Sequence, residues 1–240
     1  VSRTHIGNVR ETNEDFVMVR CETKPNYMLV ADGMGGAAAG EIASKIAAFS
    51  VQQYIEILKS EKLSPADLIG AVSYANNQIV NETRYNERLK GMGTTMTLAA
   101  IEANHIIVAQ VGDSCAYLYT HKQLHKVTKD HTYVQSLIDN GLLEKSQVED
   151  NPFKNIITRC VGMNDLEVDT YEITWNKNDI LLLCTDGLTV HAGEQDLCTI
   201  ISSQTTITQK ADDLLDYALS RGGRDNVSII IAQNTPEGTV

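Results

Sequence analysis

Prolines and long apolar runs are scarce in this sequence. It has only 4 prolines in 240 residues, and no stretch approaches the roughly 18 consecutive apolar residues that a membrane-spanning helix needs. The N-terminus shows no basic, apolar and small-residue series typical of a signal peptide. Hydrophobic residues still make up 42% of the chain, which is enough for one large or two small globular domains. These features predict a folded protein that does not enter a membrane.

Paired cysteines are missing as well. The cysteines are odd in number, widely spaced and free of any Cys-x-x-Cys pair; they are Cys21, Cys115, Cys160, Cys184 and Cys198. This pattern argues against a disulfide-bonded scaffold and against a zinc ribbon, and it suits a reducing compartment. We therefore expect a cytoplasmic protein.

The chain also lacks a cluster of positive charge. Its formal net charge of −11 is spread along the sequence, and no group of lysines and arginines with interleaved aromatic residues occurs. Nucleic acid is therefore not an expected partner. An acidic protein that acts on anions would need a cation to do so, and this requirement points to a metal.

The spacing of apolar residues predicts short strands mixed with helices. One helix is expected over 40–59, and "SPAD" at 64–67 indicates the start of a second, with Ser64 as N-cap and Asp67 as the capping-box acid. The other expected elements are strands at 3–7, 15–20, 26–31, two runs within 94–114, 115–127, 166–174, 179–185 and 226–234, helices at 194–202 and 208–220, and a polar, helical insertion at 130–155 in which Gly141 ends a helix. Hairpin-linked strands with helices inserted in blocks predict antiparallel sheets covered by helices, an α+β fold.

Four aspartates stand at the ends of expected strands. They are Asp32 in "VADG", Asp113 in "VAQVGD", Asp186 in "LLLCTDG" and Asp225 in "GGRDN". Any one of them is explained by the preference of Asp and Gly for turns. Four together, each beside an apolar run, favour a site for Mg²⁺ or Mn²⁺, which bind carboxylates, backbone carbonyls and water. Gly33 has no Cβ and would let its carbonyl approach a cation beside Asp32.

The segment "GNVRETNED" at 7–15 carries charges of both signs. Glu14 and Asp15 close it, and Arg10 lies five residues before Asp15. Arg10 could simply be an exposed side chain paired with Glu11 or Glu14, a pair that contributes little to stability. The functional alternative is that its planar guanidinium binds two oxygens of a phosphate.

Several motifs occur in an order that resembles one enzyme family. They are "GNVRETNED" (7–15), "ADGMGG" (31–36) with "AGEIAS" (39–44), "GMGTTM" (91–96), "VGDS" (111–114), "DH" (130–131), "NIITRCVG" (155–162), "LLLCTDGL" (181–188) and "GGRDNVS" (222–228). The chain resembles the type 2C, metal-dependent (PPM) protein serine/threonine phosphatases, and among them the compact bacterial branch, from residue 3 to 233. The resemblance implies a single domain over 1–240: a central β-sandwich of two antiparallel sheets flanked by helix pairs, with a two-metal site at one end.

The resemblance also assigns metal ligands. Asp32 would bridge both metals, and Gly33 would bind the first through its main chain. Asp186 and Asp225 would bind the second metal. These are the residues that the strand-end pattern singles out independently.

Further roles follow from the same resemblance. Glu14 and Asp15 would hold metal-bound waters, directly or from outside the ligand sphere, and Arg10 would bind the substrate phosphate. Asp113, together with Asp186, would bind a third, weaker metal. The segment 130–155 would be a mobile flap over the site.

The implied activity is hydrolysis of phosphoserine and phosphothreonine in proteins. Two Mn²⁺ or Mg²⁺ ions would activate a water that attacks phosphorus directly. No Cys-x₅-Arg arrangement is present to suggest a phosphoenzyme instead. The implied partners are phosphorylated proteins, the products of a serine/threonine kinase in bacterial signal transduction, and the implied enzyme is a monomer.

The sequence departs from the family pattern at a few positions. Met34 stands where animal relatives have a histidine assigned as general acid, so that role has no residue here. Cys115 replaces a common arginine, and "EDNPFKN" (149–155) lacks a frequent histidine before the proline. The histidines show no metal-site spacing, and His131, beside Asp130, is interpreted as structural.

Two rival functions use the same fold or the same ligand type. A non-catalytic pseudophosphatase would bind phosphoproteins as a regulatory module, but intact Asp32, Asp186 and Asp225 argue against it. A Ca²⁺-stabilised structural module would also use acidic oxygens, but no D-x-D-x-D-G loop is present. Release of phosphate from a phosphopeptide with Mn²⁺, Mg²⁺ or Ca²⁺ separates the three.

Overall fold

The computed structural model describes residues 1–35, 39–148 and 151–235. Its elements in chain order are β1 (Ser2–His5), β2 (Asp15–Arg20), β3 (Asn26–Met34), α1 (Ala39–Leu58), α2 (Pro65–Tyr85), η1 (Glu87–Leu89), β4 (Gly93–Thr94), β5 (Met96–Glu102), β6 (His105–Val111), β7 (Cys115–Thr120), β8 (Gln123–Lys126), α3 (Tyr133–Asp139), η2 (Lys145–Gln147), β9 (Asp169–Thr174), β10 (Ile180–Cys184), α4 (Asp186–Thr189), α5 (Glu194–Ile201), α6 (Ile207–Ser220) and β11 (Val227–Gln233). No helix in these three segments is both long enough and apolar enough to cross a membrane.

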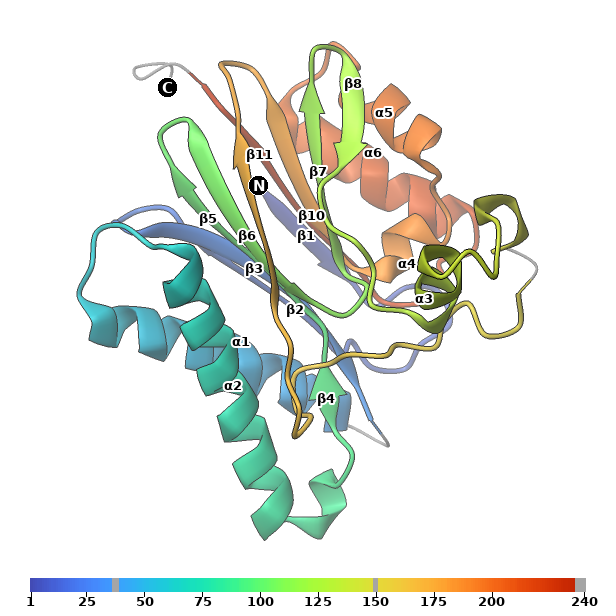
Figure 1. Ribbon diagram of the computed structural model, residues 1–240. Coiled ribbons are helices and arrows are strands. Elements are labelled where there is room, and N and C mark those ends of the chain that lie inside the picture. The colour runs from blue at the N-terminus through green and yellow to red at the C-terminus, as the bar shows by residue number, and fades with distance from the viewer. Residues whose placement is uncertain (36–38, 149–150, 236–240) are drawn as a thin grey trace.

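Two antiparallel sheets lie face to face (Figure 1). One has the strand order β1-β11-β10-β7-β8, and the other has the order β2-β3-β5-β6-β9, with β4 paired to the end of β3. Most neighbouring strands are hairpin partners, but β1 pairs with β11, so that Ser2 lies opposite Ile230. This pairing brings the first residues of the chain beside the last strand.

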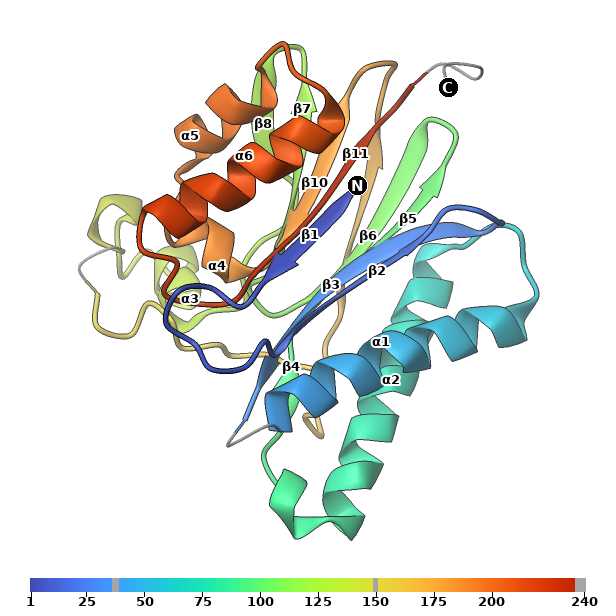
Figure 2. The ribbon, with the colours of Figure 1, turned by 180° about the vertical axis from the view of Figure 1, so that it is seen from behind.

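Apolar side chains fill three layers. Helices α1 and α2 cover the outer face of the second sheet, and α5 and α6 cover the outer face of the first (Figures 1 and 2). Successive residues of a strand point to opposite faces. Leu29 of β3 therefore packs under α1 and α2, while its neighbour Val30 packs between the sheets. Leu182 and Leu181 of β10 divide in the same way between the helix layer and the middle layer.

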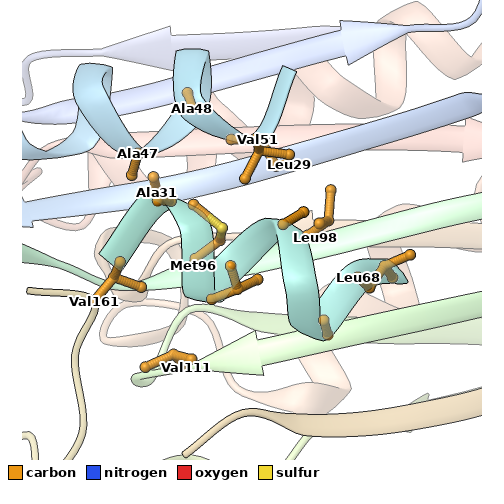
Figure 3. Close-up of a cluster of buried hydrophobic side chains, with 14 of the residues drawn as sticks. Leu29, Ala31, Ala47, Ala48, Val51, Leu68, Met96, Leu98, Val111 and Val161 are labelled. Atoms are coloured by element: carbon orange, nitrogen blue, oxygen red, sulfur yellow. The ribbon is translucent and has the colours of Figure 1, made fainter. Parts of the chain in front are cut away.

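Small residues let α1 approach the sheet closely. Ala43, Ala47, Ala48 and Val51 are fully buried and lie at the spacing of one helix face. Figure 3 shows this face packed above Leu29 and its neighbours. Removing these apolar groups from water is the main stabilising term for such a layer.

The start of α2 is the capping box that the sequence predicts. Ser64 Oγ accepts a hydrogen bond from the N–H of Asp67 (3.3 Å), and Asp67 Oδ2 accepts one from the N–H of Ser64 (2.8 Å). Both bonds satisfy backbone groups that the helix itself leaves unpaired.

The predicted α+β fold of two antiparallel sheets flanked by helices is confirmed. The predicted end of the third strand is wrong. That strand was expected over 26–31 but runs from Asn26 to Met34, because its last residues pair with β4. Asp32 therefore lies inside the strand and not after it.

The predicted helical insertion at 130–155 is only partly helical. It contains α3 and the short 3₁₀ helix η2, and the other described residues are turns and loops apart from Thr132, which forms an isolated β-bridge with Ile157. Gly141 has a φ of +68° directly after the C-cap of α3, so it ends that helix as predicted. Residues 149 and 150, which belong to the expected flap and to "EDNPFKN", lie outside the described residues.

Smaller differences concern other boundaries. The strand expected at 3–7 ends at His5, and the strand expected at 166–174 begins at Asp169. The short helix α4, one residue after β10, was not expected. It makes Asp186 the first residue of a helix.

Candidate metal centre

Asp15 and Asp32 face each other on neighbouring strands. They are register partners in the β2–β3 pair. Asp15 Oδ2 accepts a hydrogen bond from Thr185 Oγ1 (2.9 Å), which joins the second sheet to the end of β10 in the first. The N–H of Asp32 donates to Thr95 Oγ1 (2.9 Å). These bonds hold both carboxyl groups at the same end of the sandwich.

Asp186 and Asp225 come to that end on the other sheet. Asp186 follows β10 by two positions, Asp225 precedes β11 by two positions, and the two strands pair antiparallel. A Cβ on Gly187 would lie 1.9 Å from the carbonyl oxygen of Asn226. Glycine at position 187 therefore lets the two acid-bearing segments pack this closely.

Asn226 organises the loop before β2, and sequence reasoning missed it. Its Oδ1 accepts a hydrogen bond from the N–H of Glu14 (2.8 Å), and its Nδ2 donates to the carbonyl oxygens of Ile6 and Thr12 (2.9 Å each). Its own N–H donates to Asp225 Oδ1 (2.8 Å). The only signal in the sequence is its place directly after Asp225.

Gly33 lies where three backbone segments meet. Its N–H donates to the carbonyl oxygen of Glu14 (3.1 Å). A Cβ at this position would lie 2.0 Å from the carbonyl oxygen of Gly40, in the first turn of α1, and 2.7 Å from that of Glu14. The structure thus gives a packing reason for glycine here, in addition to the approach of a cation that the sequence predicts.

Arg10 lies at the rim of the acids. Its Nη2 pairs with Asp225 Oδ2 at 2.7 Å, and its side chain remains 52% exposed. The sequence alternatives paired Arg10 with Glu11 or Glu14, but its ion-pair partner is an acid 215 positions away. The pair places a guanidinium beside the candidate site with part of its surface open.

Asp113 adds a carboxylate from the end of β6. Burial, then the nearby charges of Asp186 and Asp130, raise its pKa to about 7. Asp130 in turn pairs with Lys126 at 2.6 Å. The carboxylate of Asp113 is therefore close to the charges of Asp186 and Asp130, and Lys126 is the cation that pairs with Asp130.

Electrostatic repulsion links the whole group. Burial, then neighbouring acids, raises the pKa of Asp15 to about 7 and that of Asp186 to about 6. The pKa of Asp32 is also raised well above its ordinary value, by burial and then by the charges of Asp15, Asp186, Asp113 and Asp225. Asp32 is thus the centre of a cluster of like charges, and a divalent cation would relieve that repulsion.

Several buried carboxylate oxygens have no hydrogen-bond partner among the described residues: Oδ1 of Asp15, Asp113, Asp130 and Asp186. Buried polar atoms are ordinarily paired, and unpaired anionic oxygens fit a hard divalent cation. As the described side chains are oriented, no three acidic, histidine or cysteine groups already enclose an ion. Arg10 and Thr185 bind two of the acids instead. The donor set therefore suits Mg²⁺ or Mn²⁺, and the side chains would turn to bind one.

The family pattern described as Protein phosphatase 2C matches residues 3–222. The chain belongs to this family. The predicted resemblance is thereby confirmed over most of the sequence.

Similar proteins and solved structures support membership of the phosphatase 2C family. A protein named serine/threonine phosphatase stp, from Listeria monocytogenes, is 35% identical over 96% of this chain and 94% of its own. The crystal structure of the Mycobacterium tuberculosis serine/threonine phosphatase PstP/Ppp is similar with a TM-score of 0.89, 29% identity and 98% of both chains covered. A structure of the PstP catalytic domain in complex with two manganese ions has a TM-score of 0.88 and 29% identity, and covers 98% of this chain and 97% of that one.

The structure of this 2C phosphatase gathers the acids that the sequence singles out. Asp32, Asp113, Asp186 and Asp225 interact electrostatically at one end of the sandwich, and Asp15 joins them. Sequence reasoning gave no role at the site to Thr185, Asn226 and Asp130, which bind or face these acids. Met34 follows Gly33 on β3 and is half-buried, and Gly36 of the same motif lies outside the described residues.

Proposed function

We propose that this 2C phosphatase removes phosphate from phosphoserine and phosphothreonine in proteins with the help of divalent metal ions. The observation that carries the proposal is the cluster of Asp15, Asp32, Asp113 and Asp186. Their negative charges repel one another, and several of their buried oxygens have no hydrogen-bond partner among the described residues. The names of the relatives support the substrate class. The manganese ions of the similar PstP domain support the metal.

The ligand assignment follows the arrangement of the acids. Asp32, at the centre of the cluster, would bridge two ions, and the carbonyl oxygen of Gly33 would bind the first of them. Asp186 and Asp225 would bind the second. The close approach at Gly187 supports this last pair, since it brings the two segments together.

The remaining residues would act around these ligands. Asp15 and Glu14 would hold water next to the ions, and Asp113 with Asp186 would hold a third ion more weakly. Arg10 would bind the substrate phosphate, because it is an exposed, fork-shaped donor already placed beside Asp225.

The reaction that this arrangement suits is direct hydrolysis without a phosphoenzyme. When bound, the ions would supply a water of lowered pKa as the nucleophile and would offset negative charge on the phosphoryl oxygens. Asp32 and Asp186 would orient that water by fixing where the cations sit, and Arg10 would orient the phosphate opposite it. Met34 has no proton to give, so the side chain at this position does not protonate the leaving alkoxide.

We also propose one phosphatase domain over 1–240, with a flap at 130–155. Its substrates would be products of a serine/threonine kinase. The monomeric state and the cytoplasmic location stay predictions.

The test is phosphate release from phosphoserine and phosphothreonine peptides by the purified chain. We expect release with Mn²⁺ or Mg²⁺, none with a chelator, and little with Ca²⁺. The matched control is Asp32→Asn, which keeps the side-chain shape and removes the central charge. Binding of the peptide with no release in any metal would favour the pseudophosphatase alternative, and release that resists chelation would refute the metal mechanism.

A further inference from the structure

Gly112, the residue before Asp113, is held on both sides of its backbone by one histidine. Its N–H donates to Nδ1 of His131 (3.1 Å), and its carbonyl oxygen accepts a hydrogen bond from the N–H of His131 (2.9 Å). Gly112 has a φ of +100°, and a Cβ there would lie 2.6 Å from the side chain of Thr95. The turn therefore has little freedom of its own. Gln110 Nε2 also donates to the carbonyl oxygen of Gly112 (3.2 Å), whereas His131 supplies the acceptor for the Gly112 N–H and so helps to fix the place of Asp113.

Asp169 fixes the ring of His131. Because Nδ1 accepts the hydrogen bond from Gly112, a neutral ring carries its proton on Nε2. Nε2 then donates to Asp169 Oδ2 (3.1 Å), and Asp169 Oδ1 accepts from Arg159 Nη1 (3.0 Å). His131 is only 7% exposed. Burial lowers its pKa, which favours the neutral form that this bonding requires.

His131 also belongs to the segment that ties down the flap. Residues 131–133 pair with residues 156–158, and the carbonyl oxygen of His131 accepts a hydrogen bond from the N–H of Thr158 (2.8 Å). His131 thus contacts both the turn that carries Asp113 and the segment 156–158 that follows the flap. A displacement of 156–158 would reach Gly112 through His131.

We propose that His131 is a positioning residue, which fixes the Asp113 carboxylate in the acid cluster through the backbone of Gly112. The same residue couples that carboxylate to residues 156–158, which directly follow the flap. The inference rests on the proposed function, in which Asp113 holds the most weakly bound cation. It replaces the interpretation of His131 as a merely structural histidine.

Two amide variants separate positioning from simple packing. In His131→Asn, the side-chain oxygen lies near the place of Nδ1 and can still accept from Gly112, but the contact with Asp169 is lost. In His131→Gln, the amide reaches toward Asp169, and no acceptor remains for Gly112. A role in packing alone would make both variants unstable in similar measure and leave the folded enzymes alike.

The matched control is His105→Asn. His105 begins β6, at the opposite end of the strand from Gly112, and its Nε2 lies 3.1 Å from Glu172 Oε2 on β9. It therefore repeats the pairing of a histidine with an acid of β9 far from the cluster. Its substitution should leave every quantity below unchanged.

The first readout is hydrogen exchange of the Gly112 amide, followed by NMR without added metal. We expect His131→Gln to speed this exchange roughly ten- to a hundredfold and His131→Asn to change it by less than about threefold, as loss or retention of one buried hydrogen bond predicts. Equal exchange in the two variants would overturn the proposal. This readout does not require the chain to be a phosphatase. It therefore tests the role of His131 independently of the proposed function.

The second readout is Mn²⁺ binding by calorimetry together with phosphopeptide kinetics. His131→Gln should weaken the weakest Mn²⁺ site about tenfold and lower kcat by a similar factor with KM unchanged, while His131→Asn recovers most of both. A change in KM with kcat intact would place His131 in substrate binding and refute positioning. If His131→Gln does not fold, Asp169→Asn, which leaves the ring in place and loosens its orientation, must show a smaller loss of the same kind, and no change would again refute the proposal.

Discussion

The middle of strands β3 and β10 differs from their ends in what it buries. In the middle, Leu29, Val30 and Leu182 are apolar and fully buried, and their burial favours folding. At the ends stand Asp32 and Asp186, whose charged forms burial and mutual repulsion oppose. Stability explains the first arrangement and not the second. Buried charged groups that destabilise the fold locally are characteristic of functional sites.

This comparison predicts that the two regions respond differently to substitution. A change at the acidic end should remove activity and leave the fold, because the acids are not what holds the sandwich together. A change in the middle should remove stability and leave the chemistry of the folded fraction.

Asp186→Asn should have the largest effect on activity. The neutral amide removes one charge from the proposed ligand set, and we expect phosphopeptide turnover at saturating Mn²⁺ to fall by roughly a thousandfold or more. The melting temperature in the absence of metal should stay the same or rise, because repulsion within the cluster decreases. The control is Asp216→Asn on the exposed face of α6. If the turnover of Asp186→Asn were close to that of the wild type, Asp186 would not be a metal ligand.

Leu182→Ala tests the other region. Leu182 is fully buried between the first sheet and its helices, and deletion of a buried leucine side chain costs about 2 to 5 kcal/mol of the free energy of unfolding. Urea denaturation measures this loss, and kcat measured well below the melting temperature should be unchanged. A large fall in kcat at intact stability would show that the two regions are not independent.

Much of this contrast could be predicted from the sequence. An apolar run that ends in Asp-Gly marks both Asp32 and Asp186, and local rules also predicted the capping box at Ser64. The order of the motifs supplied the family. What local patterns could not supply is the pairing of β4 with the end of β3, since it depends on a partner some 60 positions away.

The supporting residues were harder to predict for the same reason. Thr185 binds Asp15 across 170 positions, and Asn226 binds Glu14 across 212. Neither residue type is distinctive, because threonine and asparagine are common in loops and caps. Only the packing of one sheet on the other shows that these two side chains hold the acids in place.

Arg10→Ala should have an intermediate effect. Loss of a charged, two-pronged contact with phosphate costs roughly 1.5 to 3 kcal/mol, which corresponds to a rise in KM of about ten- to a hundredfold. Mn²⁺ affinity, measured by calorimetry, should change little, although Asp225 loses its ion-pair partner. Arg10→Lys keeps the charge without the planar fork and should recover only part of the loss. An unchanged KM in Arg10→Ala would mean that Arg10 pairs with Asp225 but does not bind the substrate phosphate.

The smallest expected effect is on stability as a function of pH when metal is removed by a chelator. The pKa values of Asp15 and Asp113 in the folded protein are raised from 3.8 to about 7, and that of Asp186 to about 6. Between these limits the folded state binds more protons than the unfolded state, so the free energy of unfolding decreases as pH rises from 4 to 7. We expect urea titrations to show this loss in the free energy of unfolding between pH 5 and pH 7.5. The lowered pKa of His131 acts in the opposite direction. The informative quantity is therefore the slope of the free energy of unfolding against pH in the wild type, compared with the same slope in Asp186→Asn, where the decrease should be smaller.

Leu182→Ala should keep the wild-type slope at a lower stability, because it leaves every titrating acid in place. Saturating Mn²⁺ should reverse the trend, since the ionised carboxylates then bind a cation. A wild-type slope equal to that of Asp186→Asn would show that the acidic end carries no more electrostatic strain than the apolar middle.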